Sequence, residues 1–207
     1  MALVKYNNNS ISAVTSASSI PSGALTHIKT LTASSSGTLS FVDGSSGVVL
    51  DSTYPIYKFE FINCHPATDN TDFTFNMSTD GGSNYNVVKT TTAFEANHSE
   101  DDGTAFLGYV ASRDLAQSTA VQDLILDVGN GADEGCSGTL QLFNPSSTTF
   151  VKHFISVFNG YQSINLSQNF YVAGYGNTTS AINAVQFKFD SGNIDAGTIK
   201  LYGIKDS

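Results

Sequence analysis

The residues of this chain that could do chemistry lie in a few short polar segments. The densest of them is the run 97–103, Asn-His-Ser-Glu-Asp-Asp-Gly. Its carboxylates Glu100, Asp101 and Asp102 could serve as ligands of Ca²⁺, which takes about six to eight oxygen atoms. The acidic residues do not alternate and carry no distal Glu, as the calcium loop of an EF-hand would. We therefore expect a solvated hairpin tip, with a calcium site as the alternative and no other cofactor.

Catalytic residues are not evident. Paired acids for glycoside hydrolysis must lie about 5–9 Å apart across a cleft, whereas most acids of this chain occur in turn-like segments, where Asp is favoured without any function. Glu60 and Asp127 lie within expected strands and would be the first residues to test for a glycan-degrading enzyme. Cys64 stands beside His65, but no second Cys/His pair lies at zinc spacing. We also find no phosphate loop or nucleophile elbow, and expect that the chain is not an enzyme.

The segment 78–85, Ser-Thr-Asp-Gly-Gly-Ser-Asn-Tyr, fits the S-x-D-x-G-x-x-aromatic pattern of the Asp-box hairpins found in sialidases. In such a turn the Asp side chain accepts backbone N–H groups, a Gly takes the left-handed conformation and the aromatic ring packs beneath. Sialidases repeat the motif several times, and this chain has one copy. We therefore interpret it as a folding device.

Sugar binding would need exposed aromatic side chains beside polar groups. Trp, the strongest such platform, is absent from the chain, but Tyr161, Tyr171 and Tyr175 lie close in sequence to the loops 160–162 and 174–179. Packing in a core or an interface is the commoner fate of such tyrosines. Contact with a host surface glycan is the alternative hypothesis.

Composition excludes several classes of protein. The 207 residues include 40% hydrophobic residues, enough for a packed core, and the net charge of −9 argues against binding to nucleic acid or anionic lipid. No window approaches the roughly 18 apolar residues of a membrane span, and the N-terminus lacks the apolar region of a signal peptide. One disulfide between Cys64 and Cys136 is possible, but it needs Cα atoms within about 7 Å. Cys64 ends an alternating strand and Cys136 lies in a Gly-rich turn, so we expect two independent free thiols.

Period-two alternation of apolar and polar residues covers most of the chain and predicts strands with one buried face. In 57–61, 73–77 and 185–189 the odd positions are apolar or aromatic. Helical periodicity is nearly absent, with one helical turn expected within 112–122. Turn signals separate twelve expected strands: 25–32, 38–43, 55–64, 72–79, 84–95, 104–111, 122–128, 138–144, 150–158, 168–175, 184–190 and 197–203.

These short, evenly spaced strands predict an all-β fold, an antiparallel jelly-roll-like β-sandwich over residues 25–207. Residues 1–24 contain too few apolar residues for a core of their own, and we expect an extended N-terminal arm. The arm could add a strand to an exposed sheet edge of another protein. Its apolar residues, the candidate attachment residues, are Val4, Tyr6, Ile11, Val14 and Ile20.

Four segments also resemble a family of small virion structural proteins from tailed marine bacteriophages, especially cyanophages. They are MALVKYNNNSI (1–11), HPATD (65–69), LFNPSSTTFVKH (142–153), and NTTSAI (177–182) through SGNIDAGTIKLYG (191–203). These segments are distributed from one end of the chain to nearly the other, but none of them carries a motif for an activity. Members of this family resemble tail-fibre, head-fibre or decoration proteins.

The resemblance implies a non-enzymatic protein on the exterior of the virion, assembled in the host cytoplasm with other capsid or tail proteins. We expect a fibre or adhesin module attached by its N-terminal arm. A capsid decoration protein and a carbohydrate-binding domain for host glycans are the alternatives. By analogy with viral jelly rolls and fibres, we expect a homotrimer.

Overall fold

The computed structural model describes residues 24–205 and is built from β-strands, with no helix in that range. None of these residues forms a helix that could cross a membrane. The twelve strands are β1 (Leu25–Thr32), β2 (Leu39–Val42), β3 (Ile56–Pro66), β4 (Thr71–Ser78), β5 (Lys89–Ser99), β6 (Ala105–Tyr109), β7 (Gln122–Val128), β8 (Cys136–Phe143), β9 (Lys152–Gln162), β10 (Leu166–Gly176), β11 (Ala184–Phe189) and β12 (Ile194–Ile204).

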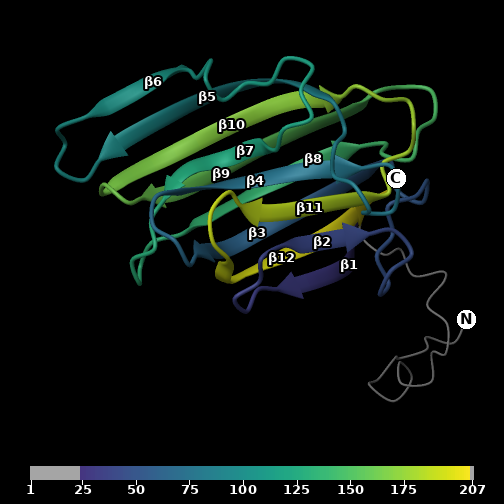
Figure 1. Ribbon diagram of the computed structural model, residues 1–207, viewed down its shortest axis with the longest axis horizontal. Coiled ribbons are helices and arrows are strands. Elements are labelled where there is room, and N and C mark those ends of the chain that lie inside the picture. Colours follow the sequence, from purple (N-terminus) through teal and green to yellow (C-terminus); the bar gives the residue numbers. More distant parts are fainter. Residues whose placement is uncertain (1–23, 206–207) are drawn as a thin grey trace, which may run out of the picture.

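All strand pairs are antiparallel, and the sheet curls until it is nearly closed into a barrel (Figure 1). Its main path runs β1-β12-β3-β8-β9-β7-β4-β11-β2, and a branch at β9 continues through β10 and β5 to β6. The ladder between β7 and β9 consists of one residue pair, Val128 with Gln162. Two broad portions, β2-β11-β4-β7 and β1-β12-β3-β8-β9-β10-β5-β6, therefore meet along a narrow junction.

Aromatic side chains fill the space between these two portions. Phe187 on β11 is fully buried, and its ring centroid lies 5.2 Å from that of Phe59 and 4.8 Å from that of Phe61, both on β3. Strands β3 and β11 are not hydrogen-bonded neighbours. These edge-to-face contacts therefore join the two layers across the core, where aromatic pairs gain energy beyond their buried area. In Figure 1, β4, β11 and β2 cross in front of β3 and β12.

The predicted all-β, antiparallel character is confirmed, and every expected strand overlaps an observed one. The helical turn expected within 112–122 is wrong. This segment instead runs alongside β5, where Thr91 N donates to Leu115 O at 2.9 Å and Lys89 N donates to Ser118 O at 2.8 Å. Because β5 satisfies its backbone groups, the segment has no need of helical hydrogen bonds.

The predicted N-terminal arm lies outside the described residues except for Ala24, whose carbonyl accepts a hydrogen bond of 3.0 Å from Lys205 N. The candidate attachment residues Val4, Tyr6, Ile11, Val14 and Ile20 all belong to the undescribed part.

Candidate functional site

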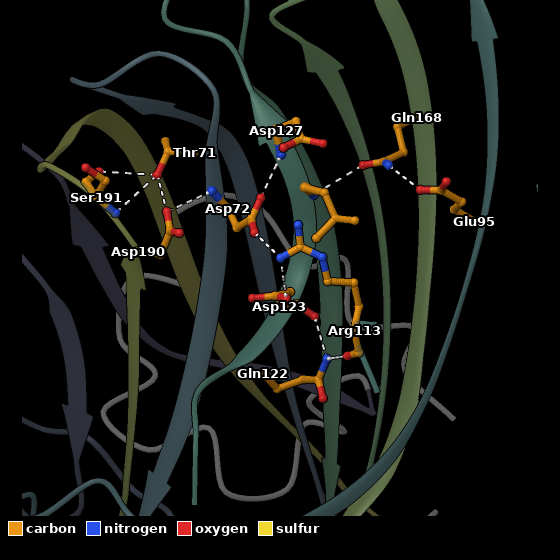
Figure 2. A network of polar contacts seen from close by, with 11 residues as sticks. Thr71, Asp72, Glu95, Arg113, Gln122, Asp123, Asp127, Gln168, Asp190 and Ser191 are labelled. Carbon is orange, nitrogen blue, oxygen red and sulfur yellow. Dashed lines mark hydrogen bonds and ion pairs between the residues drawn. The ribbon is translucent and has the colours of Figure 1, made fainter. Parts of the chain in front are cut away.

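A network of polar side chains links the layers at the ends of β4 and β7 (Figure 2). Its centre is Arg113, in the loop between β6 and β7. One guanidinium nitrogen, Nη1, donates to Asp72 Oδ2 at 2.6 Å and to Asp123 Oδ2 at 3.3 Å. Asp72 lies on β4 and is 6% exposed, and Asp123 lies on β7. A loop cation thus bridges carboxylates from two adjacent strands.

The remaining oxygens of the network are also engaged. Asp72 Oδ1 accepts a hydrogen bond of 2.8 Å from Asp127 N. Asp190, which follows β11, accepts from Asp72 N at 3.0 Å and from the Thr71 hydroxyl. The carboxylates therefore hold backbone groups of β4 and β7 in place, as a structural clamp would.

Buried glutamines extend the network toward β10 and β5 (Figure 2). Gln168 is 1% exposed; its amide nitrogen donates to Glu95, and its oxygen accepts from Leu126 N at 3.2 Å. Gln122 donates to Arg113 O at 3.1 Å and accepts from the Thr91 hydroxyl at 2.6 Å. These two amide groups have all their hydrogen bonds within the protein. They connect the layers at a place where the backbones of the two layers are not paired.

The electrostatics of the network follow from burial. Burial raises the pKa of Asp123 to about 6, with repulsion from Asp72 adding to the effect, although Arg113 opposes it. Burial likewise raises the pKa of Asp72 against the lowering effects of the Asp127 backbone hydrogen bond and Arg113. The carboxylates, the guanidinium and the amides of the network bond to one another and to backbone groups, so the arrangement positions strands.

The two acids selected for an enzymatic role are not brought together. Glu60, on β3, accepts from Lys58 Nζ at 2.8 Å in a partly exposed ion pair. Asp127 lies on β7, which is not a neighbour of β3 in the sheet, and has a left-handed φ of 53°. The geometry therefore offers this pair no shared cleft.

The acidic run 97–103 forms the expected turn, and its side chains bond within it. Asp101 accepts from the Ser99 hydroxyl at 2.7 Å and from Gly103 N at 2.9 Å, and these bonds lower its pKa. His98 Nε2 lies 3.0 Å from Asp102 Oδ1. Within residues 24–205, no three His, Cys, Asp or Glu side chains gather closely enough to hold a metal ion.

The Asp-box segment has the local structure that its pattern predicts. Asp80 Oδ1 accepts from Asn84 N at 2.9 Å and from the Ser78 hydroxyl at 2.7 Å. Bonds from the side chains of Asn84 and Ser78 lower the pKa of Asp80 to about 2. Gly81 and Gly82 take φ values of 73° and 82°, which glycine adopts without steric cost. The motif closes a turn, as expected for a folding device.

The three candidate tyrosines lie in different surroundings. The register of β9 and β10 places them on one outward face. Tyr161 lines a pocket of about 720 Å³. Tyr171 stacks on Phe94 of β5, with ring centroids 4.7 Å apart, and Tyr175 meets His153 edge-on at 6.0 Å beside a second hollow of about 490 Å³. The three residues therefore do not form one binding site.

The pocket at Tyr161 is polar and acidic. His65 Nε2 donates to Gly131 O at 3.1 Å, which fixes one side of the pocket. The Tyr161 hydroxyl donates to Asn165 Oδ1 at 3.2 Å, and the nearby Glu100 carboxylate raises the pKa of Tyr161. The side chains that line this pocket and can bond a ligand include Asn63, His65, Glu100, Asp133, Glu134 and Tyr161. The arrangement combines an aromatic ring with carboxylate and amide groups.

Apolar residues are exposed on the outward face of β5, β6, β9 and β10, here called the outer face. The cross-strand partners of the sheet place Phe94, Leu107, Tyr109, Ile155 and Tyr171 together on it. Leu107 is 74% exposed, Tyr109 55% and Ile155 50%. No Asp, Glu, Lys or Arg occupies an outward position on these four strands. The outer face therefore combines exposed apolar side chains with polar residues that are not acids, lysines or arginines.

Sequence reasoning missed two buried lysines. Lys89 is fully buried, and its Nζ donates to Asn76 Oδ1 at 2.6 Å and to Val87 O at 2.9 Å. Burial lowers the pKa of Lys89 to about 8. Lys152 is also fully buried and donates to Phe150 O at 2.7 Å. The alternation of β5 could have predicted that Lys89 is buried, because Lys89 lies four residues before the inward residue Ala93 and therefore on the same face of the strand.

The expectation of two independent thiols is wrong in its geometry. Cys64 on β3 and Cys136 on β8 are both free, but they are directly opposite one another in the antiparallel ladder. Cys136 begins a strand; it is not part of the Gly-rich turn before it. The tertiary fold, through strand pairing over long sequence separation, brings the two residues together.

We compared the chain with models of known protein families, with curated protein sequences and with solved structures, and none of the three comparisons found a match. The functional interpretation therefore rests on the residues and geometry described above.

Proposed function

We propose that this chain is a non-enzymatic structural protein on the exterior of a tailed bacteriophage virion. It would act as a fibre- or adhesin-type module, attached to other virion proteins through residues 1–24. The observation that carries the proposal is the outer face of the β-body, where exposed apolar side chains gather without Asp, Glu, Lys or Arg, a combination that suits assembly more than catalysis. The four sequence segments that resemble marine phage virion proteins point to the same class.

We also propose that the fold is an expanded jelly roll. A jelly roll has eight strands, B to I in chain order, in two sheets ordered B-I-D-G and C-H-E-F, and it is common in viral capsid proteins. The order β2-β11-β4-β7 matches B-I-D-G strand for strand. In the other portion β3 matches C, β5 matches E and β6 matches F, while the meander β8-β9-β10 takes the place of H. Strands β12 and β1 extend the sheet beyond β3.

The outer face supports self-association into the homotrimer that we propose. The chain carries a net charge of −9, so copies repel one another over most of their surfaces. On the outer face this repulsion is weakest, since its outward positions carry no Asp or Glu. Apolar contact there would bury Leu107 and Tyr109, which are more than half exposed in the isolated chain.

Labelling of phage particles tests the proposed location. Antibodies raised against the purified chain and coupled to gold should decorate the outside of intact virions in electron micrographs. A few gold particles at the tail or at fibre tips would support the fibre module. Dense labelling over the head would favour the alternative, a decoration protein. Unlabelled particles, together with absence of the chain from their protein content, would refute a virion role.

Leu107→Glu should weaken self-association at least tenfold, because it places a charge that must be desolvated in the centre of edge strand β6. Sedimentation equilibrium of the purified protein measures this change. The matched control is Ile164→Glu, which adds the same charge at a residue that is 70% exposed at the turn between β9 and β10. A wild-type chain that sediments as a monomer up to high concentration would rule out this use of the outer face.

The pocket at Tyr161 favours a second candidate function, binding of a host glycan. The aromatic ring could stack on a sugar, and the carboxylates and amides could bond its hydroxyl groups. Because Glu100, Asp133 and Glu134 line the pocket, we expect a neutral or amino sugar in preference to an acidic one. A glycan array should then show binding by the wild type and by Tyr171→Ala, and loss of at least tenfold in affinity for Tyr161→Ala. Absence of binding by the wild type would remove this candidate.

A further inference from the structure

The two cysteines of the chain meet the geometric condition for a covalent bond. Cys64 and Cys136 are Cα partners in the antiparallel β3–β8 ladder. Directly opposite residues in such ladders have Cα atoms about 4.5–5.5 Å apart. Disulfides span Cα distances of about 4.4–6.8 Å. Strand pairing alone therefore places the two residues within bonding range.

The side chains also point toward the same space. Opposite residues of a ladder share a face of the sheet, and here that face is the core, where Cys64 is 0% and Cys136 3% exposed. Burial raises the pKa of Cys136, and the neighbouring Cys64 thiol adds to the effect. The register shifts between Phe61 and Cys64, and the pair is the last one of its ladder.

The pair lies close to the surface of the molecule, next to the pocket at Tyr161. Cys136 and the preceding Gly135 form part of the lining of the pocket at Tyr161, whose volume is about 720 Å³. Among residues 24–205, no other cysteine competes for a partner. Because the Cys136 side chain faces the core and is 3% exposed, a small thiol reagent reaches it when this end of the ladder opens locally.

We propose that Cys64 and Cys136 form an intramolecular disulfide when the folded protein meets a small-molecule disulfide such as oxidised glutathione. The Cys136 thiolate attacks one glutathione sulfur and expels the other as a glutathione thiolate, which leaves a mixed disulfide on Cys136. The Cys64 thiolate then attacks the Cys136 sulfur and expels the second glutathione thiolate. The two cysteines lose two protons and two electrons, and oxidised glutathione becomes two molecules of reduced glutathione.

The disulfide would stabilise the folded sheet after the protein has assembled. It joins β3 to β8 and encloses β4, β5, β6 and β7 within one covalent loop. Because closing a long loop restricts the unfolded chain, the oxidised protein gains stability that the reduced protein lacks. Since the attacking group is the thiolate, burial keeps the reaction slow at neutral pH and a higher pH accelerates it. The protein would fold with reduced cysteines, and the disulfide would form later in an oxidising medium.

The test uses the full-length purified protein. It is incubated with oxidised glutathione at pH 7 and at pH 9, the reaction is quenched with acid, and mass spectrometry is run under non-reducing conditions. We expect loss of two hydrogen atoms from the intact mass, a Cys64–Cys136 cross-linked peptide, and faster conversion at pH 9. The thermal midpoint should rise by roughly 5–10 °C and return after treatment with dithiothreitol.

The variant Cys64→Ala serves as the control. It should accumulate a glutathione adduct on Cys136 and show no rise in thermal midpoint, because no second thiol can displace the glutathione. For the wild type, two free thiols after incubation at pH 9, a glutathione adduct on each cysteine, or disulfides between separate chains would overturn the proposal. The wild-type measurement decides the matter even if the variant does not fold.

Discussion

Phe187→Ala should lower the free energy of unfolding by about 3–5 kcal/mol, the range for truncating a buried aromatic residue. Phe187 is 0% exposed, and its ring contacts Phe59 and Phe61 across the core. It also lies within 6.4 Å, between ring centroids, of Phe73 on the adjacent strand. The substitution therefore leaves a cavity at the point where the two layers pack. Urea unfolding followed by fluorescence or circular dichroism measures the loss.

Phe150→Ala provides the matched control, since Phe150 is 68% exposed in the loop before β9. It should change the free energy of unfolding by less than about 0.5 kcal/mol. Equal effects of the two substitutions would contradict the packing described here, because the side chains differ only in burial.

Asp123→Asn should stabilise the protein at pH 7 by roughly 2–3 kcal/mol and flatten its pH dependence between about pH 4 and pH 6. Burial raises the pKa of Asp123 from 3.8 to about 6. The folded state therefore holds more protons than the unfolded state in this window, and stability decreases as pH rises through it. Asn mimics the protonated carboxyl and can still accept from Arg113. Urea unfolding at a series of pH values gives the two profiles.

Asp80 affects the free energy of unfolding in a different range of pH. The pKa of Asp80 is lowered to about 2. Its contribution is present above pH 3.8 and is lost as pH falls toward 2. Glu60→Gln serves as the control for charge alone, since Glu60 lies in a partly exposed pair with Lys58. If Asp123→Asn destabilised the protein at pH 7, the attraction to Arg113 would outweigh the cost of burial, contrary to our assignment.

The strands could be predicted from the sequence because each packs one face in the core. In β3 the aromatic residues Tyr57, Phe59 and Phe61 alternate with polar ones, and the structure buries those aromatic residues. A local repeat of this kind is visible in any single segment. The order of the strands is not visible in this way, because it depends on pairings between residues far apart in the chain.

The same limit explains what was missed at the candidate sites. Asp72 and Arg113 lie 41 positions apart, and only the fold brings them to 2.6 Å. The contact between Cys64 and Cys136 likewise comes from the pairing of β3 with β8. The three tyrosines are close in sequence but have different neighbours. Tyr171 stacks on Phe94, Tyr161 lines the pocket, and Tyr175 contacts His153.

The narrow junction between β7 and β9 has a mechanical consequence. Their ladder is one residue pair long and is held by two backbone hydrogen bonds, Gly129 N to Tyr161 O at 3.2 Å and Ser163 N to Asp127 O at 3.1 Å. The buried Gln168 side chain on β10 adds a contact to Leu126 N of β7. Side-chain contacts can shift by small rotations, whereas a continuous ladder opens only by rupture. We therefore expect small displacements of one portion of the sheet against the other to occur at this junction before any longer ladder opens.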